Sequence, residues 1–186
     1  MKRNDKGFSL VELVIVMAVM AILISIGVRN LGVLDTYRTR ECKDKIVSAL
    51  KNNKIDCLSK SKSNTSTAYT GAKGSTVTAD AYLEIKYENK SVYVIKYLPE
   101  KNGGPTTASI AEKVSKGTNT TIKYKVGSTE ETLADGESLM IGYNRSTGAF
   151  LPINASGTYC EEIIVQAGTK TRIIHLETKT GKISSQ

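Results

Sequence analysis

The chain has 186 residues and a formal net charge of +8; 40% of its residues are hydrophobic and 24% are charged. This balance excludes a chain that is disordered throughout, and the length allows one domain with an appendage. The lysines are scattered singly among Thr, Ser and Tyr, which favours a solvated surface over a concentrated nucleic-acid-binding patch.

A short polar segment, residues 1–7, precedes a long apolar run, residues 8–28. The polar segment holds three basic side chains, Lys2, Arg3 and Lys6. Glu12 is the single charged residue of the apolar run. A helix of this length spans roughly 30 Å, which is the thickness of the hydrocarbon core of a bilayer. We therefore expect a membrane-spanning helix with its basic end in the cytoplasm and the chain after Arg29 outside.

Three interpretations of this segment compete. An ordinary secretory signal peptide would be cut after the apolar run, and Ser25-Ile26-Gly27 is a weak match to such a cleavage site. That interpretation predicts a mature start near Val28. A plain membrane anchor leaves Glu12 unexplained, because an acid at the centre of a bilayer costs about 2.5–3.5 kcal/mol and normally marks a function.

The third interpretation rests on residues 6–13, which read Lys-Gly-Phe-Ser-Leu-Val-Glu-Leu. This stretch closely resembles the processing motif of type IV pilins and pseudopilins. The resemblance implies that a prepilin peptidase cuts after Gly7 and methylates the new amine of Phe8. It makes Glu12 the fifth residue of the mature chain, the position at which that family carries a carboxylate. The partners that it implies are the prepilin peptidase, the membrane and other pilin subunits.

The chemistry of Phe8 and Glu12 is consistent with this resemblance. Cleavage would place an α-amine, with a pKa of about 7.7–8, beside the hydrocarbon. An amine–carboxylate pair in low dielectric offsets much of the cost of the two separate charges. The two residues are one helical turn apart, so they can pair within one chain. After an axial shift, Glu12 of an incoming subunit could instead meet the amine of its neighbour, which would set the register of assembly.

A stripe of apolar residues at helical spacing continues beyond the apolar run. Its members are Leu31, Leu34, Cys42, Ile46, Ala49, Leu50 and Cys57. We predict one helix from about Phe8 to about Leu58, with residues 29–58 as its amphipathic continuation. Gly27 and Gly32 each cost about 1 kcal/mol relative to Ala in a helix. A helix that ends near Gly32 and restarts is therefore the alternative.

Residues 59–186 are expected to form an extracytoplasmic, β-rich head domain. Residues 59–79 are rich in Ser, Thr, Lys and Gly and predict an exposed loop. Ser109 and Glu112 form a capping-box pattern that predicts one short helix ending at Gly117. Alternating apolar residues predict the strands, which are 81–87 paired with 91–97, 121–126, 139–143 paired with 149–151, 162–166 paired with 172–176, and 180–183.

The predicted fold class is therefore α+β, with a long N-terminal helix packed on an antiparallel β-sheet. The hairpins are also similar to the β domain of minor pseudopilins of the type II secretion and pilus-tip kind.

The three cysteines allow two outcomes. Cys42 and Cys57 are fifteen residues apart, roughly 22 Å along a helix and beyond the reach of a disulfide. Any bridge would then tie Cys160 to one of them, and Cys57 is favoured because it lies nearer the helix end. Three buried thiols are the equal alternative.

The sequence contains no pattern that supports an enzyme, a cofactor or a metal site. His175 stands alone among apolar neighbours in a predicted strand, and Glu161-Glu162 is interpreted as a solvated start of a strand. There is no cysteine pair with zinc spacing and no Gly-rich phosphate loop.

We therefore predict a structural subunit of a type IV pilus or pseudopilus. Its precursor would cross the inner (cytoplasmic) membrane once, and its assembled form would lie in an extracytoplasmic or cell-surface filament. One alternative is a DNA-uptake or secretion pseudopilin whose head domain binds DNA or a secreted substrate. The other is a secreted or anchored binding domain with an ordinary signal.

Overall fold

The computed structural model describes residues 9–59, 67–70, 76–79, 81–99, 106–115, 120–153 and 157–186. Helix α1 (Leu10–Ser59) comes first, and β-strands make up the regular structure of the later described residues. The chain divides into two compact units, Met1–Leu34 and Asp35–Gln186, with the boundary inside α1. The predicted α+β class, with a helix packed on antiparallel sheets, is confirmed.

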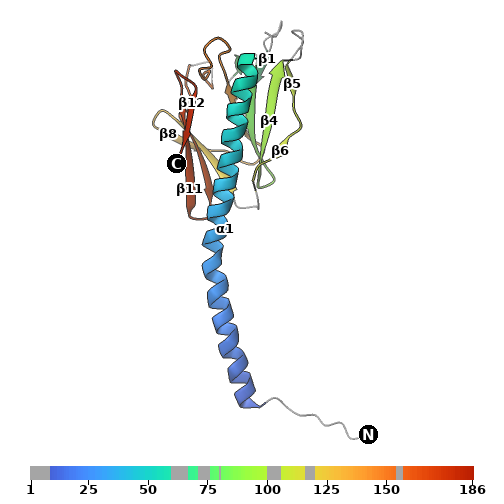
Figure 1. Cartoon of the computed structure of the whole chain (residues 1–186), viewed down its shortest axis with the longest axis vertical. Coiled ribbons are helices and arrows are strands. Elements are labelled where there is room, and N and C mark those ends of the chain that lie inside the picture. Colours follow the sequence, from blue (N-terminus) through green and yellow to red (C-terminus); the bar gives the residue numbers. More distant parts are fainter. Residues whose placement is uncertain are drawn as a thin grey trace, which may run out of the picture. The chain divides into compact units, whose positions relative to one another are not determined.

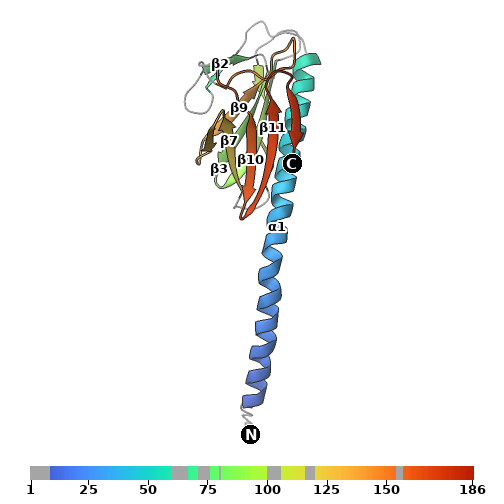
Figure 2. The same cartoon turned by 90° about the vertical axis from the view of Figure 1, so that its left-hand side faces the viewer.

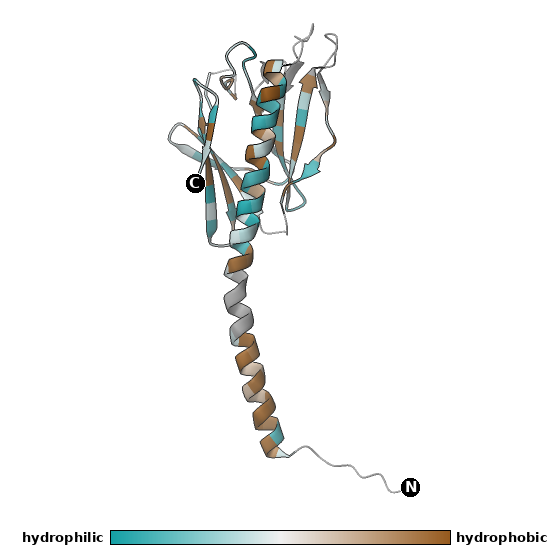
Figure 3. Cartoon of the chain, in the orientation of Figure 1, coloured by the Kyte–Doolittle hydropathy of each residue, from teal (hydrophilic) through white to brown (hydrophobic). Residues whose placement is uncertain are grey.

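The first unit contains the apolar part of α1, which Figure 3 colours mostly as hydrophobic. Its large apolar side chains from Leu10 to Ile24 are 49–79% exposed. A helix that is apolar all round is typical of a segment that lies in lipid or in the interior of an assembly. The helix continues through Gly27 and Gly32, so the alternative with a break near Gly32 is not observed.

Two larger antiparallel sheets form most of the second unit (Figure 1). One has the order β12-β11-β10-β7-β8 and consists of β7 (Thr120–Val126), β8 (Thr129–Thr132), β10 (Glu162–Ala167), β11 (Lys170–Glu177) and β12 (Lys182–Ser185). The other has the order β5-β4-β3-β9, with β6 also beside β4, and consists of β3 (Tyr82–Glu88), β4 (Ser91–Pro99), β5 (Thr106–Ala108), β6 (Glu112–Lys113) and β9 (Ser138–Gly142). The predicted single sheet is therefore two sheets, because β7 pairs with β10 and β9 with β3, far along the chain.

The second half of α1 packs against both sheets, as Figures 1 and 2 show. The helix contributes one stripe of buried side chains to the core, Cys42, Ile46, Ala49, Leu50 and Cys57. These side chains belong to the same cluster as Leu83 and Ile85 of β3 and Ile163 of β10. Each large apolar side chain that is fully buried contributes about 1.5–3 kcal/mol. The predicted stripe is thus buried from Cys42 onward, whereas Leu34 is 48% exposed.

Polar contacts fix the position of the helix on the sheets. The Asn53 side-chain amide donates to the backbone oxygen of Tyr82 at 3.2 Å, at the start of β3. The hydroxyl of Tyr143, directly after β9, donates to the backbone oxygen of Leu50 at 2.9 Å. Lys54 donates to two backbone oxygens of the turn after β11, Thr180 at 3.1 Å and Gly181 at 2.9 Å. Both sheets are therefore tied to one short stretch of α1.

The predicted helix over residues 109–117 is wrong. The structure has an extended segment there with β6 beside β4, and residues 116–117 lie outside the described part. Ser109 exchanges hydrogen bonds with Lys96, and the Ser115 hydroxyl accepts the backbone N–H of Val92 at 2.8 Å. The edge of β4 thus takes the Ser109 hydroxyl that a capping box would have used, and tertiary pairing overrides the local signal.

Two further details differ from the predictions. The expected loop over residues 59–79 contains a hairpin, β1 (Thr67–Thr70) with β2 (Thr76–Ala79), because both strands are rich in β-branched residues, which favour extended structure. Residues 149–151 form a single bridge, Tyr143 with Phe150, and no strand. The predicted hairpins around residues 88–90 and around Gly168 are confirmed as β3–β4 and β10–β11.

Candidate functional site

The first unit begins with a reciprocal pair of hydrogen bonds between Ser9 and Glu12. The backbone N–H of Glu12 donates to the Ser9 hydroxyl oxygen at 3.2 Å. The backbone N–H of Ser9 donates to a carboxylate oxygen of Glu12 at 3.1 Å. Because α1 starts at Leu10, Ser9 is the N-cap and Glu12 the third helical residue, which is the arrangement of a capping box. The acid predicted for assembly therefore also takes part in starting its own helix.

The other two predicted processing residues, Gly7 and Phe8, lie outside the described residues. Glu12 itself is exposed. Within the residues that the structure describes, no helix has a stretch both long enough and apolar enough to cross a membrane. Ser9 was missed by the reasoning from sequence, although the pattern Ser-x-x-Glu directly before an apolar run signals a capping box.

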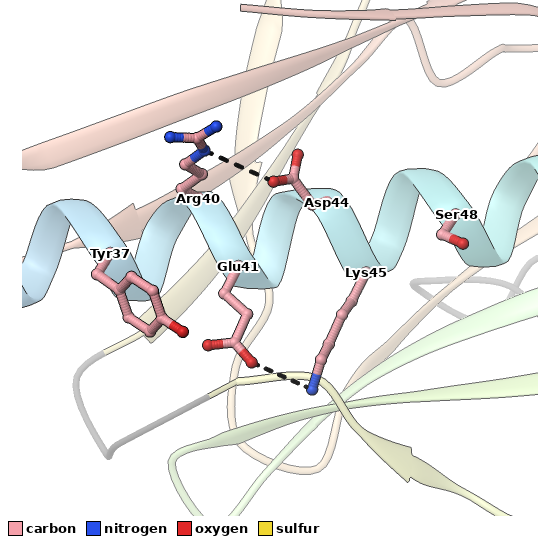
Figure 4. A pocket seen from close by; sticks show the side chains of 6 residues that line it. All are labelled: Tyr37, Arg40, Glu41, Asp44, Lys45 and Ser48. Atoms are coloured by element: carbon pink, nitrogen blue, oxygen red, sulfur yellow. Dashed lines mark ion pairs between the residues drawn. The ribbon is translucent and has the colours of Figure 1, made fainter.

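A surface groove of about 430 Å³ lies along α1 in the second unit (Figure 4). It is lined by six residues of the helix, Tyr37, Arg40, Glu41, Asp44, Lys45 and Ser48. Its charges are paired one helical turn apart, with Arg40 at 3.8 Å from Asp44 and Lys45 at 3.5 Å from Glu41. Such pairs support a solvated helix face.

His175 lies on β11 as a partly exposed residue of the sheet, as predicted. Its Nδ1 is 3.3 Å from Glu162 on β10, and the same carboxylate is 3.9 Å from Lys125 on β7. The three side chains form one row across neighbouring strands. No group of three His, Cys, Asp or Glu side chains suited to a metal ion occurs in the described part of the chain. The row is therefore a set of cross-strand polar contacts between neighbouring side chains.

All three cysteines are buried, and the Cys57–Cys160 bridge is not formed in this structure. The two thiols have different surroundings. Cys57 Sγ lies 3.8 Å from the backbone oxygen of Tyr143, and Cys160 Sγ lies 3.4 Å from that of Glu162. Burial raises the pKa of the Cys42 thiol from 9.0 to about 12, and it raises the pKa of Cys160 to about 12 as well.

These buried thiols predict that the protein loses stability in alkaline solution. Between pH 9 and 12 the thiols ionise in the unfolded chain while the folded chain keeps its protons, so the free energy of unfolding falls. The expected fall is ~1 kcal/mol per pH unit for each thiol. Urea unfolding of the reduced full chain in detergent, followed by far-UV circular dichroism from pH 8 to pH 10.5, measures it. The double variant Cys42→Ala/Cys160→Ala should lose less over the same interval, and an equal loss would contradict the prediction.

Comparison with known proteins identifies the N-terminal segment. The family described as "Prokaryotic N-terminal methylation motif" matches residues 2–28, which include Gly7, Phe8 and Glu12. No curated protein and no solved structure matches the chain. The motif implies a structural protein that is processed by a prepilin peptidase and packs with other pilin subunits. This motif, together with the α+β fold, supports a place for the chain among the type IV prepilins and pseudopilins.

Proposed function

We propose that the chain is a structural subunit of a type IV pilus or pseudopilus. The precursor is inserted in the membrane through residues 8–28, is cleaved after Gly7 and is methylated at Phe8. It then assembles through packing of the apolar helix and through pairing of Glu12. The observation that carries this proposal is the methylation motif at residues 2–28, with Glu12, the single acid of residues 8–28, in the first turn of α1.

The processing chemistry accounts for the residues at the start of the chain. Hydrolysis adds one water across the Gly7–Phe8 bond, so the leader leaves with a carboxylate on Gly7 and the mature chain keeps an amine on Phe8. Glycine has no Cβ, so the peptidase can approach the backbone closely at this bond. Transfer of one methyl group from a methyl-donor cosubstrate leaves an amine that still carries a positive charge. That charge needs the Glu12 carboxylate once water is excluded.

The apolar part of α1 supports assembly through helix packing. Its described side chains from Leu10 to Ile24 are exposed in the single chain. Burial of apolar area against neighbouring subunits is worth about 25 cal/mol per Å², which compensates for leaving the lipid. Glu12 is the one charged group within this surface, and it therefore selects the register in which an amine faces it.

Lysines on the two sheets bear on the alternative in which the head domain binds DNA. Three of them lie against carboxylates, namely Lys86–Glu88 at 3.0 Å, Lys123–Glu130 at 2.9 Å and Lys125–Glu162 at 3.9 Å. A lysine paired with an acid adds little to the attraction of a phosphate backbone. The filament role is therefore better supported than nucleic-acid binding.

Mass spectrometry of the protein isolated from its native cells tests the proposal. We expect a mature chain that starts at Phe8 and carries one added methyl group on its amine. A mature start near Val28 would identify an ordinary signal peptide, and the filament proposal would then fail.

A further inference from the structure

We propose that Ser9 is a positioning residue for assembly, and this inference rests on the proposed function. Its hydroxyl keeps the first turn of α1 closed, and the closed turn holds the Glu12 carboxylate at the end of the helix. There the carboxylate receives the N-terminal amine of a neighbouring subunit. Ser9 thus acts through Glu12 and does not itself contact the partner's amine.

The two hydrogen bonds of the capping box have different roles in this arrangement. The bond from the Glu12 backbone N–H to the Ser9 hydroxyl, at 3.2 Å, involves no atom of the Glu12 side chain. It can therefore persist when that side chain engages a partner. The bond from the Ser9 backbone N–H to the Glu12 carboxylate, at 3.1 Å, orients the carboxylate toward the N-terminal end of α1. The first bond stabilises the first turn of the helix, and the second orients the Glu12 carboxylate.

The Glu12 carboxylate has the capacity for a second partner. An ionised carboxylate can accept about four hydrogen bonds, and the Glu12 side chain is exposed. An amine can therefore bind while one oxygen still accepts the Ser9 N–H. Holding the long Glu side chain in place beforehand removes part of the rotamer entropy that the pairing would otherwise lose.

The charges at the start of the helix favour the same arrangement. The first turn of α1 carries the positive end of the helix dipole, and the amine of a cleaved Phe8 would lie one residue before the N-cap. Both attract Glu12, the only acid within residues 8–28. A serine hydroxyl caps the helix without bringing a second negative charge that would compete for the amine.

Two readouts on the full chain test this role. Amide hydrogen exchange of Glu12, measured by NMR on the protein in detergent micelles, reports the capping box. The fraction of mature subunit in sheared filaments from native cells reports assembly. For Ser9→Ala we expect Glu12 exchange about fivefold faster, the equivalent of ~1 kcal/mol of lost capping, and a filament fraction lowered severalfold while cleavage after Gly7 continues. Ser9→Thr should restore both readouts.

Ser25→Ala is the matched control, because it removes the same hydroxyl further along the same helix and should change neither readout. If Ser9→Ala speeds exchange yet enters filaments at the wild-type level, the positioning role is overturned while the proposed function stands. If Ser9→Ala leaves Glu12 exchange unchanged, the capping box itself is overturned. If the wild-type chain is neither cleaved after Gly7 nor found in filaments, the proposed function fails and this inference fails with it.

Discussion

Replacing Glu12 with alanine is expected to leave cleavage after Gly7 largely intact and to abolish entry into filaments. The acid lies outside the scissile bond, so the peptidase loses no reacting group. In the filament, however, the methylated amine of Phe8 would be buried without its carboxylate. Breaking a buried ion pair by removing one partner costs about 3–5 kcal/mol, which is more than a hundredfold in an assembly equilibrium. Mass analysis of the mature chain and the protein content of sheared filaments measure the two effects separately.

Two further variants sharpen this prediction. Glu12→Gln keeps a side chain that can complete a capping box but removes the negative charge, so it should also fail to assemble if the charge is what matters. Glu112→Ala makes the alanine substitution at an exposed acid on β6 and should assemble normally. Normal filaments from Glu12→Ala would contradict the role assigned to the carboxylate.

Gly181→Ala is expected to destabilise the second unit strongly. Gly181 has a φ of +63°, and a Cβ there would collide with the backbone oxygen of Gly148 and lie 2.9 Å from Lys54 Nζ. The side chain would therefore push apart two turns and the lysine that anchors α1 to one of them. Backbone strain of about 1–2 kcal/mol and overpacking of about 1–3 kcal/mol give a loss of roughly 2–5 kcal/mol.

Thermal unfolding of the full chain in detergent measures this loss, with near-UV circular dichroism of tyrosine as the signal. All nine tyrosines lie between Tyr37 and Tyr159, so the signal comes from the second unit alone. We expect the midpoint to fall by roughly 10 °C. Gly127→Ala is the matched control, because its φ is +59° but nothing lies within 4 Å of the added Cβ. A loss no greater than that of Gly127→Ala would show that the close approach of the two turns is unimportant.

The order and type of many elements could be predicted from local pattern. The apolar run and the stripe after it predict the helix that the structure places at Leu10–Ser59. Alternation around residues 88–90 and Gly168 predicts the hairpins β3–β4 and β10–β11. These signals depend only on residues close together in the chain, because helical and strand periodicities are local properties. For the same reason the processing motif and its acid, Glu12, are readable from the first residues.

The pairing of distant strands could not be predicted in the same way. Any exposed strand edge can accept a partner, so local pattern does not predict that β7 pairs with β10 or that β9 pairs with β3. This choice divides the strands into two sheets, both of which pack on α1. The segment after Ser109 is a second example of a long-range contact deciding the structure. Its local pattern predicts a helix, but it pairs with the edge of β4 instead.

The sequence by itself determined the methylation motif, the helix, the local hairpins and the acid at the start of the helix. The tertiary structure decided how the strands are shared between two sheets, where Lys54, Asn53 and Tyr143 tie them to α1, and why Gly181 has no room for a side chain. The physical reason is that propensity and periodicity act over a few residues. Close packing and long-range hydrogen bonds, in contrast, are satisfied only when segments far apart in the chain meet.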